Sequence, residues 1–194
     1  MLQESDNIHP FKTRQELREW LTAHCTTETS CWIRVSIKPQ TDTILYLDAV
    51  EEALCFGWID GVKKKISDTQ LAQRLSPRRK RGNWTELNKE RVRRLEKLGL
   101  MTDEGRKCLP DISEQTFQVH PQVLSEIKRD PEVYANFLTF PALYQRIRID
   151  TIQSELTAYN HPDIFQSRLV KFIENTRQGK LYGKWHDDGR LLDY

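Results

Sequence analysis

Strand-like alternation of apolar and polar residues is confined to the first half of this 194-residue chain. From Cys31 to Lys38 every second residue is apolar, which is the pattern of a strand with one buried face. Beyond residue 110 such alternation is nearly absent, and four prolines stand where helices can begin: Pro121, Pro131, Pro141 and Pro162. The sequence therefore predicts an α+β fold, with a mixed α+β domain containing a small antiparallel sheet over 1–112 and an all-helical module over 113–194.

Capping residues and helical spacing predict two helices on either side of that strand. Thr13 followed by Glu16 is a capping-box pattern for a helix over 14–24, and Gly57 ends a second helix over 47–56. The apolar residues of the second helix fall on one face, so Glu51 and Glu52 are expected to face solvent.

The sequence that follows the second helix predicts two paired strands and then a third helix. Asp60-Gly61 between apolar residues indicates a hairpin or a bulge, and 71–75 suits a second strand of the pair. Thr85 is the expected N-cap of a helix that runs to about residue 98.

Composition and terminal sequence exclude several classes of protein. With 38% hydrophobic residues and no simple-sequence segment, the chain is expected to fold rather than to stay disordered. Its longest uncharged, mostly apolar run is Ala53–Ile59, whereas a membrane-spanning helix needs about 20 residues. The polar, acidic N-terminus does not resemble a secretory signal, so a cytoplasmic location is expected. We expect the four irregularly spaced cysteines to be reduced: Cys25, Cys31, Cys55 and Cys108.

Positive charge is concentrated in one segment. Residues 63–107 hold 15 Lys and Arg against six Asp and Glu, whereas the rest of the chain is net acidic. If these residues fold together they form a positive face, which predicts an anionic partner; the alternative is an ordinary charged helix surface.

The first candidate site is the corner between the 47–56 helix and the following strand. Glu51, Trp58 and Asp60 bring two carboxylates and an indole close together in sequence, with Cys55 between them. Acid-base or nucleophilic chemistry would need a desolvated carboxylate or a base near the thiol. The alternatives are that Cys55 is a core residue and that Asp60 serves the turn.

The second candidate site is the basic loop before the third helix. Arg74, Arg78 and Arg79 supply guanidinium donors, and Asn83 and Trp84 add an amide and an indole beside a helix N-terminus. These groups are suited to binding phosphate, and an aromatic beside a basic run also suits nucleic acid. The alternative is a solvated loop in which Trp84 packs against the helix.

Common cofactor and catalytic motifs are missing from the sequence. The histidines and cysteines have no zinc-ligand spacing, and the glycine-rich nucleotide motifs and the hydrolase and metalloprotease motifs do not occur. No metal or cofactor is therefore expected.

Several of these segments resemble the YdeI/OmpD-associated family. The likeness rests on AVEEALCFGWIDG at 49–61, SPRR at 76–79 and NWT at 83–85, and it extends over roughly residues 10–110. It implies a bacterial protein linked to protection against bacteriocins and cationic antimicrobial peptides, with an outer-membrane porin as a suggested associate and no agreed reaction.

The leading hypothesis from the sequence is a non-catalytic, cytoplasmic binding protein with an anionic ligand or partner. Its expected ligand-binding residues are those of the two candidate sites: Glu51, Trp58, Asp60, Arg74, Arg78, Arg79, Asn83 and Trp84. One alternative is nucleic-acid binding through 63–107, and a second is an enzyme that uses Glu51, Cys55 or Asp60. Oligomeric state is left open.

Overall fold

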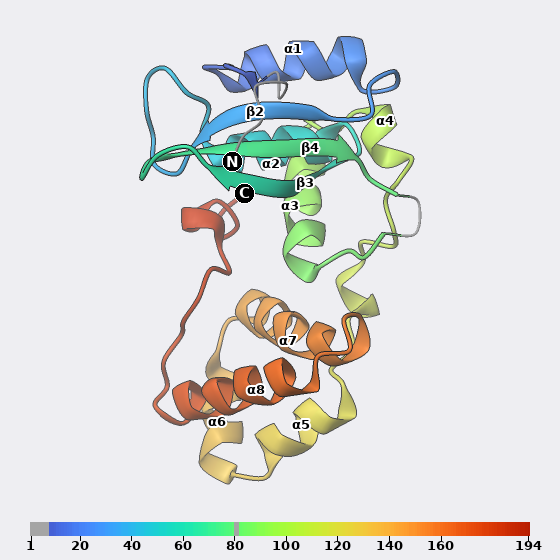
Figure 1. Cartoon of the computed structure of the whole chain (residues 1–194). Coiled ribbons are helices and arrows are strands. Elements are labelled where there is room, and N and C mark those ends of the chain that lie inside the picture. The colour runs from blue at the N-terminus through green and yellow to red at the C-terminus, as the bar shows by residue number, and fades with distance from the viewer. Residues whose placement is uncertain (1–7, 80–81) are drawn as a thin grey trace. The chain divides into compact units, whose positions relative to one another are not determined.

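The structure is a computed structural model that describes residues 8–79 and 82–194 (Figure 1). The chain forms two compact units, the first comprising Met1–Gly82 with Val92–Pro110 and the second comprising Asn83–Arg91 with Asp111–Tyr194. The fold is α+β, with a four-stranded sheet in the first unit. A single boundary after residue 112 had placed 83–91 in the first domain, whereas these residues group with the second unit.

The sheet of the first unit has the strand order β1-β2-β4-β3. Its strands are β1 (Ile8–His9), β2 (Cys31–Ser36), β3 (Trp58–Lys65) and β4 (Gln70–Pro77). β2, β4 and β3 are antiparallel neighbours, but β1 pairs with β2 in parallel, so the sheet is mixed rather than purely antiparallel as expected. A two-residue element such as β1 is too short to show the alternation that identifies a strand. The predicted bulge is present as a register shift between Asp60 and Lys63.

Two helices build the apolar layer against one face of this sheet. α1 (Arg14–His24) begins where predicted, with the Thr13 hydroxyl accepting a hydrogen bond from the backbone N–H of Glu16. α2 (Tyr46–Cys55) packs against β2 and β3, and α1 packs against α2 (Figure 1). The buried residues of this layer come from both helices and the sheet: Leu17, Leu21, Ile33, Val35, Ala49, Ala53 and Leu75.

Two further helices follow the basic loop. α3 (Glu86–Lys97) starts after Thr85, whose hydroxyl accepts a hydrogen bond from the backbone N–H of Asn88 as expected of an N-cap. α4 (Asp103–Arg106) lies against the end of α2, where the Thr102 hydroxyl donates a 2.6 Å hydrogen bond to the Cys55 carbonyl.

The second unit contains four longer helices whose starts match the prolines. They are α5 (Pro121–Lys128), α6 (Pro131–Thr139), α7 (Ala142–Thr157) and α8 (Pro162–Arg177). Two short 3₁₀ helices, η1 (Glu114–Thr116) and η2 (Asp187–Gly189), flank this group in sequence. The core is aromatic and aliphatic, with Tyr144, Phe172 and Trp185 among its largest members. Among the described residues, no helix has the length and apolar character needed to span a bilayer.

Candidate functional site

The two faces of the sheet differ in what covers them. Cys31, Ile33 and Val35 of β2 are buried on the face that packs against the helices. Because successive side chains of a strand point to opposite faces, Trp32 and Arg34 lie on the other face. Both remain partly exposed, as expected for the face without the helical layer.

Four side chains on this other face form the open-face cluster: Trp32, Arg34, Lys64 and Arg74. The strand register brings them together, since Trp32 pairs with Arg74 while Arg34 and Lys64 both pair with Ala72. Paired residues in neighbouring strands share a face, so the four surround Ala72, which is fully buried beneath them. The Lys64 ammonium lies 4.8 Å from the centre of the Trp32 ring.

The arginines of the open-face cluster lack acidic partners. Within residues 8–79 and 82–194, the side chains of Arg34 and Arg74 make neither an ion pair nor a hydrogen bond. Guanidinium groups normally find a carboxylate or a carbonyl when they pack against a protein surface. Their donors therefore remain available to an external anion, next to an indole ring.

Glu51, the first sequence-predicted site residue, lies in a buried ion-pair network on the covered side. Arg14 Nη1 donates to Glu51 Oε2 at 2.6 Å, and Arg94 Nη1 donates to Glu51 Oε1 at 2.9 Å. Glu52 binds Arg14 Nε and also Arg18 Nη1, the latter at 2.8 Å. The expectation that both glutamates face solvent is wrong, because arginines from α1 and α3 compensate their charges inside the unit.

This network serves the fold rather than chemistry. Burial lowers the pKa of the Arg14 guanidinium, but Glu52 and Glu51 outweigh that effect and raise the pKa overall. Both glutamate side chains are about 1% exposed. Enclosed carboxylates with arginines on their oxygens are poorly placed to meet a substrate.

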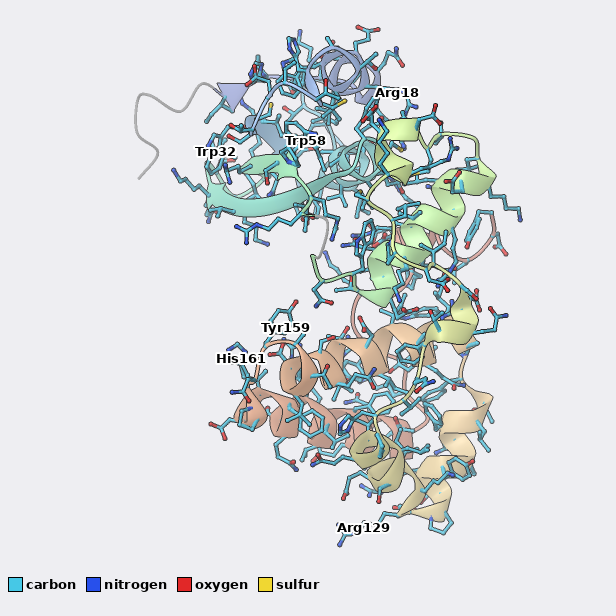
Figure 2. All side chains as sticks on the ribbon, turned by 90° about the vertical axis from the view of Figure 1, so that its right-hand side faces the viewer. Arg18, Trp32, Trp58, Arg129, Tyr159 and His161 are labelled. Atoms are coloured by element: carbon cyan, nitrogen blue, oxygen red, sulfur yellow. The ribbon has the colours of Figure 1, made fainter. Side chains whose placement is uncertain are left out.

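Trp58 is a core residue of the covered side. Its indole N–H donates to the Cys25 carbonyl at 3.1 Å, and its ring meets Trp20 edge-on with centroids 5.8 Å apart. Only 1% of Trp58 is exposed, in contrast to Trp32 on the open face (Figure 2). The indole therefore contributes packing and one buried hydrogen bond.

Asp60 and Arg78 meet at the predicted corner. Asp60 accepts a 2.6 Å hydrogen bond from the Tyr46 hydroxyl, and the Arg78 backbone N–H donates to the Gly57 carbonyl at 2.9 Å. Burial lowers the pKa of the Arg78 guanidinium, while Cys108 and Asp60 act in the opposite direction. One arginine of the basic segment thus lies beside the corner.

The structure does not place the other predicted residues of the basic loop at that corner. Arg79 is exposed, and Asn83 and Trp84 are counted with the second unit, where the Asn83 amide donates to the Tyr159 hydroxyl at 3.4 Å. Lys80 and Arg81, the middle of the basic loop, lie outside the described residues.

Cys55 does not have the properties of a nucleophile. Burial, followed by the nearby Glu52 carboxylate, raises the pKa of its thiol to about 12. Its side chain is fully buried on α2, as the core interpretation predicted. In the part of the chain that the structure describes, no group of three or more His, Cys, Asp and Glu side chains is placed to hold a metal ion.

Sequence reasoning named only Arg74 from the open-face cluster. The signal for Trp32 and Arg34 was present, because alternation had put both on the polar face of their strand. Alternation does not give the register of the paired strands. Only that register shows that Lys64 and Arg74 lie on the same face as Trp32 and Arg34.

Comparison with known proteins gives one family and no individual relative. Residues 9–108, just over half of the chain, match a family described as a domain of unknown function (DUF8412). No curated protein and no solved structure matches the chain. The matched residues contain the whole open-face cluster and the buried arginine–glutamate network, and the chain belongs to the DUF8412 family.

Proposed function

We propose that this protein is a binding protein whose open-face cluster takes an anionic ligand. The observation that carries the proposal is the pair Arg34 and Arg74, whose guanidinium donors lie beside the Trp32 ring and have no acidic partner within residues 8–79 and 82–194. Elsewhere in the same unit Arg14, Arg18 and Arg94 all bind carboxylates.

The chemistry of the cluster favours a ligand that is both negatively charged and partly flat. Each guanidinium offers planar, paired N–H donors to phosphate or carboxylate oxygens, and the Trp32 ring offers a stacking surface. Lys64 lies against that ring and adds a third positive charge to the face. Ala72 contributes no polar group, so recognition comes from its four longer neighbours.

Nucleic acid is the second candidate, favoured by one observation: an aromatic ring lies among cations on an uncovered sheet face. Base stacking on such rings is tolerant of sequence, and the cations neutralise phosphates. This differs from the sequence hypothesis for 63–107 in one respect, because β2 supplies two of the four residues. Affinity for nucleic acid would fall steeply with salt as counterions are released.

The resemblance to the YdeI/OmpD-associated family extends the proposal to a biological role. On that basis we propose a cytoplasmic bacterial protein that supports protection against bacteriocins and cationic antimicrobial peptides. Binding of an anionic component is compatible with that role, and the porin association is a further proposal of the same origin.

The test is a titration of the purified protein followed by intrinsic Trp fluorescence. The probes are single-stranded DNA, duplex DNA, anionic vesicles and phosphorylated small molecules, each at two salt concentrations. The double variant Arg34→Ala/Arg74→Ala should weaken saturable binding by at least roughly tenfold, since charge-assisted hydrogen bonds are lost. Arg129→Ala, which removes an exposed arginine of the second unit, is the matched control and should bind as wild type (Figure 2).

One result would overturn the proposal, and two others would choose between its forms. Equal binding by the double variant and the wild type would remove the open-face cluster as the site. Strong salt dependence with DNA alone would favour the nucleic-acid form, and salt-tolerant binding of one small anion would favour a small ligand.

A further inference from the structure

Arg148 of α7 differs from the other arginines around it in the second unit. Four neighbours in that unit pair with carboxylates: Arg91 with Asp187, Arg146 with Glu90, Arg168 with Glu155, and Arg177 with Asp130. Among the described residues, the Arg148 side chain makes no ion pair and no hydrogen bond. An ion pair therefore does not explain the position of the Arg148 side chain, as it does for the other four arginines.

Arg148 lies over an aromatic ring that a second cation also approaches. The guanidinium carbon is 4.3 Å from the centre of the Tyr182 ring, and the Lys171 ammonium is 5.5 Å from the same centre. Lys171 likewise has no acidic partner in the described part of the chain. The ring therefore has two positive charges near it, and an anion bound beside it would neutralise both.

Two polar atoms at this place are buried without a hydrogen-bond partner in the described part of the chain. They are Arg148 Nε and the Tyr182 hydroxyl. Buried polar groups of this kind nearly always have a partner, such as a bound water or ion.

The backbone beside Arg148 leaves space for the guanidinium. Gly183 has a φ of +79°, and a Cβ there would come within 2.8 Å of Arg148 Nη1. A glycine therefore meets both requirements: it tolerates the left-handed backbone and lets the chain run close to the charged group. The irregular segment that contains it follows α8 in sequence (Figure 1).

We infer that Arg148, Lys171 and Tyr182 form a binding site for a phosphoryl group, which we call the Tyr182 cluster. A tetrahedral phosphoryl group has enough acceptor oxygens for a guanidinium, an ammonium and a hydroxyl donor together. A planar carboxylate would satisfy the guanidinium and leave the other donors unpartnered.

This site is separate in its residues from the open-face cluster, so the two proposals can fail independently. Backbone amide NMR signals of Tyr182 and Gly183 report on the Tyr182 cluster alone. The probes are inorganic phosphate, glycerol 3-phosphate and phosphatidylcholine vesicles that contain phosphatidic acid, with sodium chloride at matched ionic strength as reference. The first two distinguish free phosphate from a phosphomonoester, and the vesicles test a lipid headgroup.

Saturable shifts of those two amides with a phosphate probe, beyond the effect of chloride, are the expected result. Arg148→Met should weaken the apparent affinity by roughly tenfold or more, because a bidentate charge-assisted contact is lost. Lys171→Met, which changes an exposed side chain and should fold normally, should weaken it several-fold. Arg129→Met is the matched control and should titrate as wild type.

The inference is overturned if phosphate and chloride shift the two amides alike, or if Lys171→Met and Arg148→Met both bind phosphate as the wild type does. If Arg148→Met does not fold, the Lys171→Met titration decides.

Discussion

The covered side and the open side of the first unit use the same residue type for opposite purposes. On the covered side, Arg14, Arg18 and Arg94 enclose Glu51 and Glu52, and all five side chains contribute to one buried network. On the open side Arg34 and Arg74 lie near an indole and meet no acid in the described chain. The comparison shows that arginine count alone says little about binding; the location of the carboxylates decides which arginines are available.

The largest expected effect is on the covered side. Glu52→Ala should lower the free energy of unfolding by about 2–4 kcal/mol, because it leaves Arg18 without its carboxylate and Arg14 with Glu51 but without Glu52. The value is below that of a fully buried pair because Arg14 and Arg18 are 28% and 26% exposed. Urea unfolding followed by circular dichroism measures it.

Glu96→Ala is the control for that prediction. It breaks the pair of Glu96 with Arg106, whose side chains are 29% and 45% exposed, and should cost much less stability than Glu52→Ala because solvent screens the pair. Equal losses for the two variants would show that the buried network does not hold the covered side together.

A smaller effect is expected at Asp150, a partly buried carboxyl that pairs with no arginine in the described part of the chain. Burial and the Glu86 carboxylate raise the pKa of Asp150, while the backbone N–H of Glu86, which donates to it at 2.9 Å, acts in the opposite direction. A raised pKa means that the contribution of this group to stability is present below the ordinary aspartate value and is lost as pH rises through the folded value.

Asp150→Asn should therefore be more stable than the wild type at pH 7, since an amide oxygen still accepts the Glu86 hydrogen bond. The difference should shrink as pH falls toward 4, and parallel urea titrations at both pH values measure it. A gap that widens in acid would contradict the assigned direction.

The smallest effect on stability is expected on the open side. Arg34→Ala/Arg74→Ala should change the free energy of unfolding by no more than about 0.5 kcal/mol per site, because neither side chain has an ion pair or hydrogen bond to lose among the residues that the structure describes. Thermal and urea unfolding of the double variant check this. A loss of stability as large as that of Glu52→Ala would show that the arginines of the open side hold the fold together as those of the covered side do.

Local signals in the sequence predicted most of the elements. The Thr13 and Thr85 hydroxyls cap α1 and α3, and prolines mark the starts of α5, α6 and α8, because caps and proline geometry act over a few residues. The bulge at Asp60-Gly61 has the same local origin.

Those local signals did not predict which residues pair with partners distant in the sequence. Glu51 and Glu52 look like exposed helix residues until arginines from other helices are placed against them, and no spacing rule identifies such partners. The open-face cluster was not predicted, for the same reason. Alternation places Trp32 and Arg34 on the same face of β2, but only the strand register joins them to Lys64 and Arg74. The parallel pairing of β1 likewise depends on contacts distant in sequence.

Ala72 gives the open face a property that its four neighbours do not have. Its methyl group lies under the cluster, fully enclosed, and pairs across the sheet with both Arg34 and Lys64. A larger residue at this position would spread the cations apart and lift them from the strand, with no change in the charges themselves. The spacing of charge on this face, and with it the size of anion that the proposed site would accept, is therefore set by a side chain that is itself fully enclosed.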